Sequence, residues 1–480
     1  MSGIVTEAAE HALRWILSTC PKGTHRPGAD WEKKDAEASE LLGWAIGYSQ
    51  LYVDHTAWSR GMMTARVDEQ ARTIVFDYPT GQTRVLSEQL DSNSARSDAF
   101  KQTIPQTVED RIVKPWIQEA IWDAQELPTL TLDRKSVEFS EVEQWGLKMV
   151  LPEIAGDRDL GGFTLSDFRQ FYIGLWLYCH SITRLEDMAD RAIGLNNPFG
   201  SRFVQGRREY VTYWLSQVCA LPTETLDRVL ELLTFDPAAR HPSLPGHPFV
   251  PTVDRALTLT TRLFARTEPD VMLCVALNSK PTRQIYESII EEIEVAAKRR
   301  LATLFKDHNY AVWDDPSLLR PGTDPLTPDL VVARGNEKWI VVIEYKHALP
   351  PLGGAGVSDR IKETSNWIKK AKRYLSAAKL QLGRIQKRLM IPEDERRVAV
   401  AIVPRWPMPV PISLDADEIV LADVSRVQRS LDRNASIAEV FGLGALPFQP
   451  SMKRDFHEIR VGDWTYKHPI LVGDIEDSVP

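Results

Sequence analysis

Two acidic residues and a lysine stand at positions in the second half of the chain where they could act together. Asp329 follows Pro328, and further on Glu344 and Lys346 flank Tyr345. Carboxylate oxygens are the ligands that Mg²⁺ and Mn²⁺ prefer, so two neighbouring carboxylates could hold such an ion. The cation could polarise a phosphoryl oxygen and lower the pKa of a bound water. The lysine could orient or deprotonate that water, because its pKa shifts readily in such sites.

The segments that carry these residues predict a β-hairpin. Residues 329–333 and 339–346 are rich in β-branched side chains, and they flank the turn-like segment 334–338, which contains Gly-Asn. Short β-branched runs on either side of such a turn are typical of paired antiparallel strands.

The register of this hairpin places the chemical groups on one face. The turn sets Ala333 opposite Ile340. Antiparallel pairing in that register brings Asp329 opposite Glu344, with Cβ atoms about 5 Å apart. Lys346 lies two residues beyond Glu344 and projects from the same face of the strand. Like charges so placed repel each other, and a bound cation would relieve that repulsion.

Helices and further strands surround the hairpin in the sequence. A long helix is expected before it, with Asn309 as the left-handed residue that ends the helix, and a second long helix after it. The expected elements are a helix at Thr282–Lys306, a strand at Tyr310–Trp313, a helix from Ser358 to Leu389, and strands at Arg397–Val403 and Glu418–Ala422.

The pattern Pro328-Asp329 … Glu344-Tyr345-Lys346 resembles the signature of the PD-(D/E)xK nuclease superfamily. The resemblance covers roughly residues 281–425. It implies a core of one helix, a mixed sheet of about four strands and a second helix, which is the order of elements expected above. It also implies that Asp329 and Glu344 bind Mg²⁺ or Mn²⁺ and that Lys346 assists the water that attacks a phosphodiester.

Members of this superfamily often add an acidic residue from the first helix. The candidates here are Glu287, Glu291, Glu292 and Glu294. Glu294 lies at the edge of the apolar stripe of that helix, about ten residues before the helix ends, and is our choice for a third metal ligand. For each of these acids, the alternative is a solvated helix face.

The helix after the hairpin carries a marked local excess of positive charge. Such a face suits contact with a phosphate backbone, which positions a duplex without reading its sequence. A solvated, lysine-rich helix face is the alternative. The residues expected to contact nucleic acid are Lys362, Lys369, Lys370, Lys372, Arg373 and Lys379.

The N-terminal half matches no family pattern and is expected to be mainly helical. Helices are predicted at Thr6–Thr19, Ala36–Tyr52, Val108–Ala124, Thr164–Cys179, Arg208–Cys219, Thr223–Leu233 and Val253–Phe264, a hairpin at Thr64–Tyr78 and a strand at Val271–Leu277. Five prolines between residues 236 and 251 indicate a break in the chain. We therefore expect a helical region at 1–250, a connection at 251–280, a nuclease domain at 281–440 and a tail at 441–480.

Composition excludes several classes of protein. No apolar stretch approaches the roughly 20 residues of a membrane span, and the N-terminus lacks the basic start of a secretory signal, so a cytoplasmic location is expected. The four cysteines are far apart and form no CxxC pair, which argues against structural zinc. The net charge of −8 requires any contact with nucleic acid to come from a local basic patch.

The sequence thus predicts an α-rich N-terminal region followed by an α/β domain of the restriction-endonuclease type, with a central mixed sheet flanked by helices. The expected function is Mg²⁺- or Mn²⁺-dependent hydrolysis of DNA, rather than RNA, by an effector of prokaryotic defence or restriction. The N-terminal region would then bind a protein partner or a second copy of the chain. The alternative is a catalytically silent subunit that binds nucleic acid or serves as a scaffold.

Overall fold

The computed structural model describes most of the chain outside three long gaps. It describes residues 31–59, 63–77, 150–193, 203–237, 243–252, 256–278, 280–320, 323–350, 353–408, 418–443 and 452–473, and the single positions 9, 12, 13, 16 and 110. Apart from a few single positions, the helices predicted at Val108–Ala124 and Thr6–Thr19 lie outside the described residues.

Contacts between residues divide this mixed α/β chain into two compact units. Unit 1 comprises residues 1–8, 42–96 and 293–480, and unit 2 comprises residues 9–41 and 97–292. The division follows contacts rather than chain order, because each unit draws on separated segments. The domain boundaries that the sequence suggested stay predictions.

Unit 1 is built on a five-stranded mixed sheet with the order β12-β11-β10-β9-β6. Its strands are β6 (Ala311–Asp314), β9 (Leu330–Ala333), β10 (Trp339–Lys346), β11 (Arg397–Pro404) and β12 (Ile419–Leu421). β9 is antiparallel to both β6 and β10, whereas β10, β11 and β12 run parallel. β9 and β10 are consecutive strands joined by a short turn, whereas the parallel strands β10 and β11 are joined by a helical crossover, described next.

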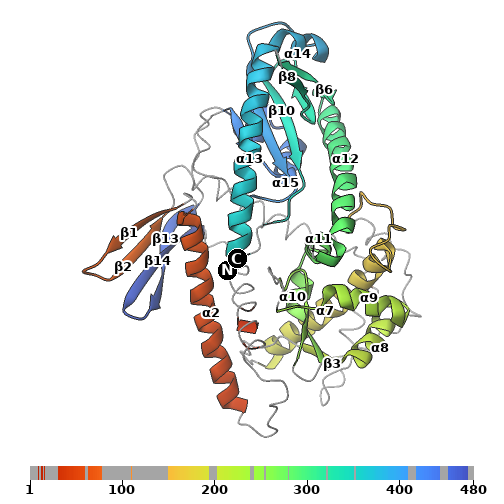
Figure 1. Ribbon diagram of the computed structural model, residues 1–480, viewed down its shortest axis with the longest axis vertical. Helices are drawn as coiled ribbons and strands as arrows, with labels where there is room; N and C mark the ends of the chain where they lie inside the picture. Colours follow the sequence, from red (N-terminus) through yellow and green to blue (C-terminus); the bar gives the residue numbers. More distant parts are fainter. Residues whose placement is uncertain are drawn as a thin grey trace. The chain divides into compact units, whose positions relative to one another are not determined.

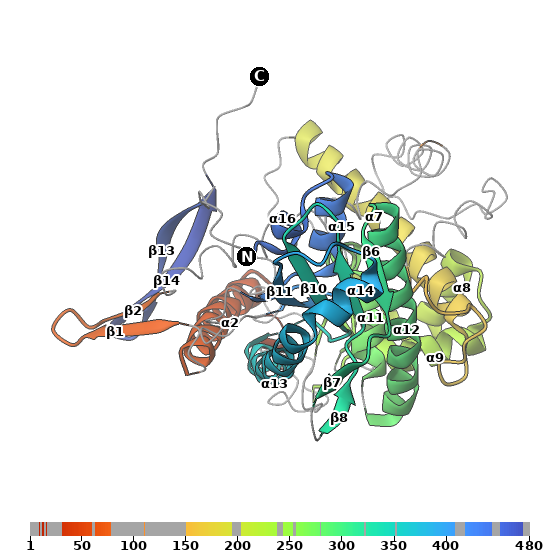
Figure 2. The same ribbon diagram turned by 90° about the horizontal axis from the view of Figure 1, so that it is seen from above.

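Helices cover both faces of this sheet. α12 (Arg283–Asp307), α15 (Val424–Asp432) and α16 (Ile437–Phe441) pack on one face. α13 (Gly353–Leu380) and α14 (Leu382–Leu389) pack on the other. Figure 1 shows α12 and α13 running along the strands, and Figure 2 shows α13 on one side of β10 and β11 with α15 and α16 on the opposite side. Two layers of core thus enclose a sheet that is apolar on both faces, as expected for parallel strands.

Alternation along the strands decides which side chains meet which helices. On β10, Val341 and Ile343 belong to the core beneath α12, whereas Ile340 and Val342 belong to the core beneath α13. Glu344 continues the second series, because side chains repeat every two residues along a strand. Glu344 and Lys346 therefore lie on the face of the sheet that α13 covers.

The hairpin register agrees with the prediction up to its last pair. Ala333 lies opposite Ile340, and the ladder ends at Leu330 and Ile343. Asp329 stands just outside the ladder. Its backbone N–H donates to Ile343 O at 3.0 Å. Its side chain makes a second contact with β10, by accepting from Tyr345 N–H.

A second sheet of unit 1 joins segments from both ends of the chain. Its order is β1-β2-β14-β13, with β1 (Thr64–Asp68), β2 (Thr73–Asp77), β13 (Met452–Val461) and β14 (Trp464–Gly473). The β1–β2 hairpin was predicted, but the second hairpin falls where the sequence suggested only a tail. α2 (Trp31–Ser59) contacts this sheet, since buried Asp54 on α2 bonds to His468 on β14 at 2.8 Å.

Unit 2 combines helices with a three-stranded antiparallel sheet of order β3-β5-β4. Its elements are α7 (Leu165–Ile193), β3 (Phe203–Arg207), α8 (Arg208–Cys219), α9 (Thr223–Leu233), β4 (Phe249–Pro251), β5 (Ala256–Thr260), α10 (Thr261–Arg266), α11 (Pro269–Leu277) and η3 (Lys280–Thr282). The start of α7 is the predicted one: Thr164 and Asp167 exchange hydrogen bonds there, which satisfies N–H groups of the first turn.

Two predictions for unit 2 were wrong. The helix expected at Val253–Phe264 is instead β5 followed by the short α10, and the alternating burial of β5 explains why. The strand expected at Val271–Leu277 is α11, in which nearly every residue is buried. An apolar run of that length fits a buried helix as well as a strand. Pro269, which occupies the first turn of α11, is a residue that favours the helix.

Two further parts of unit 1 differ from expectation. The hairpin of β7 (Leu318–Arg320) and β8 (Thr323–Leu326) was not predicted. The second long helix begins at Gly353 rather than Ser358 and is divided near Gln381 into α13 and α14.

No helix in the described part of the chain has the length and apolarity that crossing a membrane requires.

Candidate active site

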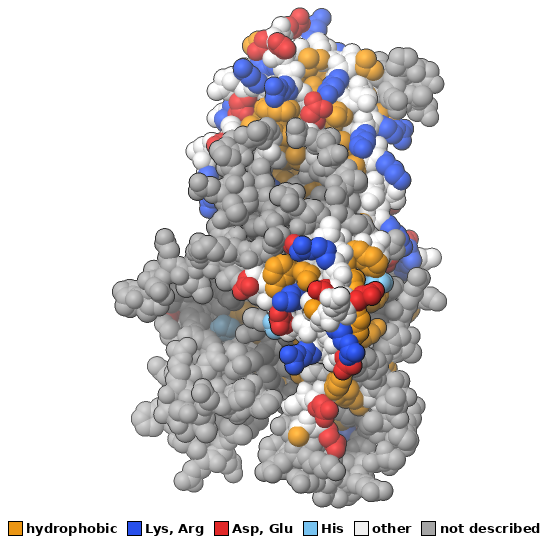
Figure 3. Space-filling view, turned by 90° about the vertical axis from the view of Figure 1, so that its left-hand side faces the viewer, with side chains coloured by type: hydrophobic (Ala, Val, Ile, Leu, Met, Phe, Trp, Pro, Cys, Tyr) orange, Lys and Arg blue, Asp and Glu red, His pale blue; other side chains and the backbone are white. Residues whose placement is uncertain are grey.

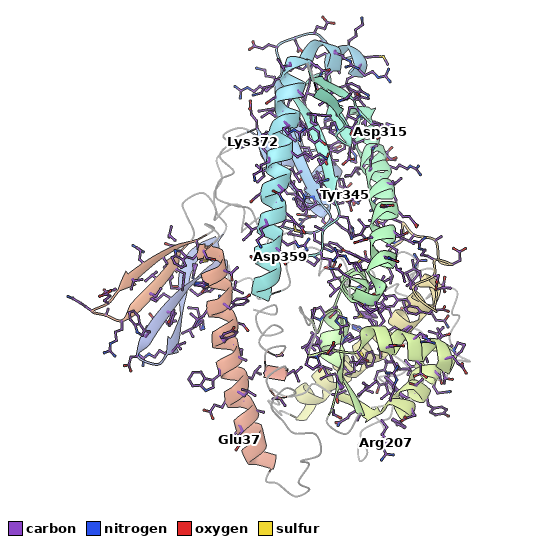
Figure 4. All side chains as sticks on the ribbon, viewed as in Figure 1. Glu37, Arg207, Asp315, Tyr345, Asp359 and Lys372 are labelled. Carbon is purple, nitrogen blue, oxygen red and sulfur yellow. The ribbon has the colours of Figure 1, made fainter. Side chains whose placement is uncertain are left out.

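Asp329 is held at the end of the β9–β10 ladder by a hydrogen bond from the main chain. Its carboxylate Oδ2 accepts from Tyr345 N–H at 2.7 Å. The carboxylate takes the position that a strand carbonyl would occupy if the ladder continued, and it is thereby fixed beside β10. Figure 4 marks Tyr345 at this end of the strand.

Glu344 is buried on the same face of the sheet. Its side chain is 6% exposed, although it carries a carboxylate. Its Oε1 accepts from Lys346 Nζ at 2.8 Å and from Lys370 Nζ at 2.6 Å. Its Oε2 is buried and has no hydrogen-bond partner. A buried carboxylate oxygen without a partner costs free energy, so the protein retains here a group that lowers its own stability.

The two lysines approach Glu344 from different elements. Lys346 stands on β10, two residues beyond Glu344, and its side chain is 22% exposed. Lys370 comes from α13, and its side chain is 44% exposed. Both ammonium groups therefore reach from the surface to one buried oxygen atom.

Tyr374 lies one turn after Lys370 and completes the wall that α13 provides. Its ring centroid is 5.2 Å from Lys370 Nζ, and its hydroxyl donates to Thr327 O at 3.3 Å. Burial raises the pKa of Tyr374 well above its usual range, and the charge of Glu344 and the proximity of its carboxylate to the phenol raise it further. The phenol is therefore neutral at ordinary pH and acts as a hydrogen-bond donor. It donates to Thr327 O, and its geometry gives Oε2 of Glu344 no hydrogen bond.

The environment of Asp329 favours the uncharged carboxyl. Burial, and then the negative charge of Glu344, raise the pKa of Asp329 from 3.8 to about 6. The hydrogen bond from Tyr345 N–H and the charges of Lys346 and Lys298 oppose that rise. Lys298, from α12, also forms an ion pair with Asp315. Two carboxylates that repel each other in a partly buried position, with a raised pKa, are a feature that functional sites often show.

Glu294 reaches the end of β10 from the opposite face. Its Oε1 accepts from the backbone N–H of His347 at 3.3 Å. In the part of the chain that the structure describes, no group of three or more His, Cys, Asp or Glu side chains is arranged to hold a metal ion. The structure thus brings Asp329, Glu344 and Lys346 together and leaves Glu294 at their margin.

The other acids of the first helix have different partners. Glu287 pairs with Arg283 at 2.9 Å on the surface of α12. Glu292 pairs with Arg158 at 2.9 Å, and Glu291 is exposed. Glu294 contacts the segment after Lys346, and its assignment as a third metal ligand stays a prediction.

His347, next to the proposed lysine, is buried. Its ring lies edge-on to Trp406, with ring centroids 5.3 Å apart. Burial, followed by the positive charge of Arg405, lowers the pKa of His347 to about 3. The imidazole is therefore neutral and packs as part of the core.

The basic residues expected to contact nucleic acid divide into two groups. Those exposed on α13 are Lys362, Lys369, Lys372, Arg373 and Lys379. Lys370 instead points to Glu344. Lys379 pairs with Glu418 at 2.6 Å, and Lys362 lies 3.8 Å from Asp359. Figure 4 marks Lys372 and Asp359 on α13. Figure 3 shows blue lysine and arginine side chains mixed with red acidic ones on the upper part of the side that faces the viewer.

Sequence reasoning missed the role of the α13 residues at the site. Lys370 was grouped with the lysines expected to contact nucleic acid, and Tyr374 was given no role at the site. The spacing of the two residues was the available indication. A position four residues before a buried tyrosine lies on the same side of a helix, so Lys370 had to project toward the sheet.

The residues present fit a hard divalent cation. Mg²⁺ and Mn²⁺ are commonly held by one or two carboxylates, with water and substrate phosphate completing the shell. Asp329 and the unpartnered Oε2 of Glu344 supply such a pair. A cation there would offset the repulsion between the carboxylates and give Oε2 a partner.

No protein-family model matches the sequence, and comparisons with curated proteins and with solved structures find no significant similarity. The interpretation of the site therefore depends on its geometry and on the chemistry of its residues.

Proposed function

We propose that unit 1 is a metal-dependent nuclease of the PD-(D/E)xK type that hydrolyses phosphodiester bonds of DNA. The observation that carries the proposal is the buried carboxylate of Glu344, which has one oxygen held by ammonium groups and the other without a partner. An arrangement that costs stability is expected where a site serves a ligand. Leaving aside the β7–β8 hairpin, the succession is α12–β6–β9–β10–α13–α14–β11, with β10 parallel to β11, and it supports the same superfamily.

In this proposal Asp329 and Glu344 hold the cation. When bound, the cation polarises a phosphoryl oxygen and lowers the pKa of a coordinated water. Lys346 stands at the exposed end of the pair, where it orients the attacking water and counters the negative charge that grows on phosphorus. Attack by water forms one P–O bond and breaks another, leaving a phosphate monoester and a hydroxyl end.

The exposed lysines of α13 position the duplex in this proposal. Lys369 and Arg373 lie one turn apart, and both are exposed, so a phosphate backbone could contact them together. Contacts of this type contribute affinity without base specificity. A cytoplasmic location, a role in prokaryotic defence or restriction, and a partner or a second copy bound by the N-terminal region are further parts of the proposal. The location rests on the composition and the N-terminal sequence, and the other two rest on the resemblance alone.

The test is a cleavage assay with the full-length protein. Supercoiled and linear DNA are incubated with Mg²⁺ or Mn²⁺, with EDTA as a control, and Lys346→Met is compared with Lys306→Met. Lys306 is exposed at the far end of α12, so its substitution matches the loss of charge. We expect cutting by the wild type and Lys306→Met only. Binding of DNA without cutting by the wild type would instead support the catalytically silent binding subunit.

A further inference from the structure

Lys370 has a different position from the other lysines of α13. Its Nζ donates to Glu344 Oε1 at 2.6 Å, whereas Lys369 and Lys372 on either side are exposed. Tyr374, whose ring lies 5.2 Å from Nζ, is itself held by Thr327 O. The direction of the Lys370 side chain is therefore set by packing between α13 and the sheet.

The two lysines leave the Glu344 carboxylate with an uneven distribution of contacts. Both ammonium groups lie on Oε1, and Oε2 has none. Lys346 approaches from β10 and Lys370 from α13, so the two donors together restrict rotation of the carboxylate. Charge-assisted hydrogen bonds of this length are among the stronger interactions available to a carboxylate.

We propose that Lys370 is a positioning residue of this site. Its ammonium fixes Oε1 of Glu344 so that Oε2 is presented to a divalent cation, and its positive charge opposes binding of that cation. The inference rests on the proposed nuclease function, because it assigns a role to Lys370 toward the metal of that function. It also removes Lys370 from the group of lysines that bind the phosphate backbone.

Two effects of opposite sign follow from this role. Lys370→Met removes a positive charge next to the carboxylate pair, so the affinity for Mn²⁺ should rise by about tenfold. The same change frees the Glu344 carboxylate to rotate, so cleavage should fall by about 10- to 100-fold, because small errors in the placement of reacting groups are costly. A lysine that only contacts DNA would leave Mn²⁺ affinity unchanged. A lysine that only supports the fold would lower affinity and cleavage together.

The experiment measures Mn²⁺ binding without DNA, by the loss of the free-ion electron paramagnetic resonance signal. The full-length wild type is compared with Lys370→Met, Lys370→Gln, Lys370→Arg and Lys306→Met, and far-ultraviolet circular dichroism checks that each variant is folded. We expect tighter binding for the Met and Gln variants, and wild-type affinity for the Arg variant and for Lys306→Met. The Gln variant, which keeps a donor for Oε1, replaces the Met variant if the latter does not fold.

The outcomes separate this inference from the function on which it rests. If the wild type binds Mn²⁺ and the neutral variants bind it no more tightly, the role of Lys370 is refuted and the nuclease proposal stands. If the wild type neither binds Mn²⁺ nor cuts DNA, the nuclease proposal fails, and the inference fails with it.

Discussion

Replacing Asp329 with asparagine should stabilise the metal-free protein at alkaline pH. Asparagine keeps an oxygen that can accept from Tyr345 N–H, and it removes the charge that burial and Glu344 disfavour. The pKa of Asp329 is raised from 3.8 to about 6, which corresponds to about 3 kcal/mol for a fully shielded group. Because Asp329 is only partly buried, we reduce this to about 1–2 kcal/mol.

The effect should depend on pH in a defined direction. A folded pKa above the unfolded value means that the neutral carboxyl stabilises the fold, fully below pH 3.8 and progressively less as pH rises through about 6. The wild type therefore carries the whole penalty at pH 8, and Asp329→Asn does not. The difference between the two proteins should approach zero below pH 4.

Urea unfolding in EDTA measures this difference. The free energy of unfolding is determined for wild type and Asp329→Asn at pH 8, 6 and 5. We expect a gain for the variant at pH 8 that shrinks toward pH 5. Adding Mn²⁺ at pH 8 should reverse the order, because only the wild type has both carboxylates. A variant that is less stable at pH 8, or a gain that is the same at every pH, would refute the reasoning.

Three further predictions concern the site, the core and the basic helix. Lys346→Met should lower cleavage by about 100-fold or more, while Mn²⁺ still binds at least as tightly as to the wild type, because a positive charge beside the two carboxylates is lost. Loss of Mn²⁺ binding would contradict the role assigned to this lysine. Phe305→Ala should lower the free energy of unfolding by about 3–5 kcal/mol, because Phe305 is fully buried between Tyr310 and Phe441. A cost below 1 kcal/mol in urea unfolding would show a loosely packed core. The double change Lys369→Ala and Arg373→Ala should weaken DNA binding measured in Ca²⁺. The slope of the logarithm of the binding constant against the logarithm of the salt concentration should become smaller in magnitude by about 1.8. An unchanged slope would exclude both residues from phosphate contact.

The parts of the fold near the site could be predicted because local patterns there agree with one another. β-Branched residues on both sides of the turn at 334–338 defined the hairpin and its register, and Asn309 has the left-handed backbone expected of it. The register failed only at its end. There the Asp329 side chain accepts from Tyr345 N–H, where a continued ladder would use a main-chain carbonyl. The spacing of residues in the sequence does not distinguish these two arrangements.

Other elements could not be predicted because their pattern depends on long-range packing. The seven apolar residues from Val271 to Leu277 carry no period that separates a strand from a buried helix. The hairpin of β13 and β14 pairs with β2, which lies near the other end of the chain. Long-range pairing of that kind leaves little trace in the local sequence.

The turn of the β9–β10 hairpin shows a further contact that the sequence did not reveal. Arg396, whose side chain is fully buried, donates to the carbonyl groups of Arg334, Gly335 and Glu337 at 2.7–2.9 Å. This guanidinium satisfies the main chain of the turn and ties it to the start of β11. A buried arginine with several carbonyl partners can be recognised only when the fold is known.

The most direct test of the account is to locate the cation itself. Crystals of the full-length protein are soaked in MnCl₂, and an anomalous difference map is measured at the manganese edge. The account predicts a peak between the Asp329 carboxylate and Oε2 of Glu344, and no such peak in Asp329→Asn. A manganese peak elsewhere in the wild type, or none at these carboxylates in a fully soaked crystal, would contradict it.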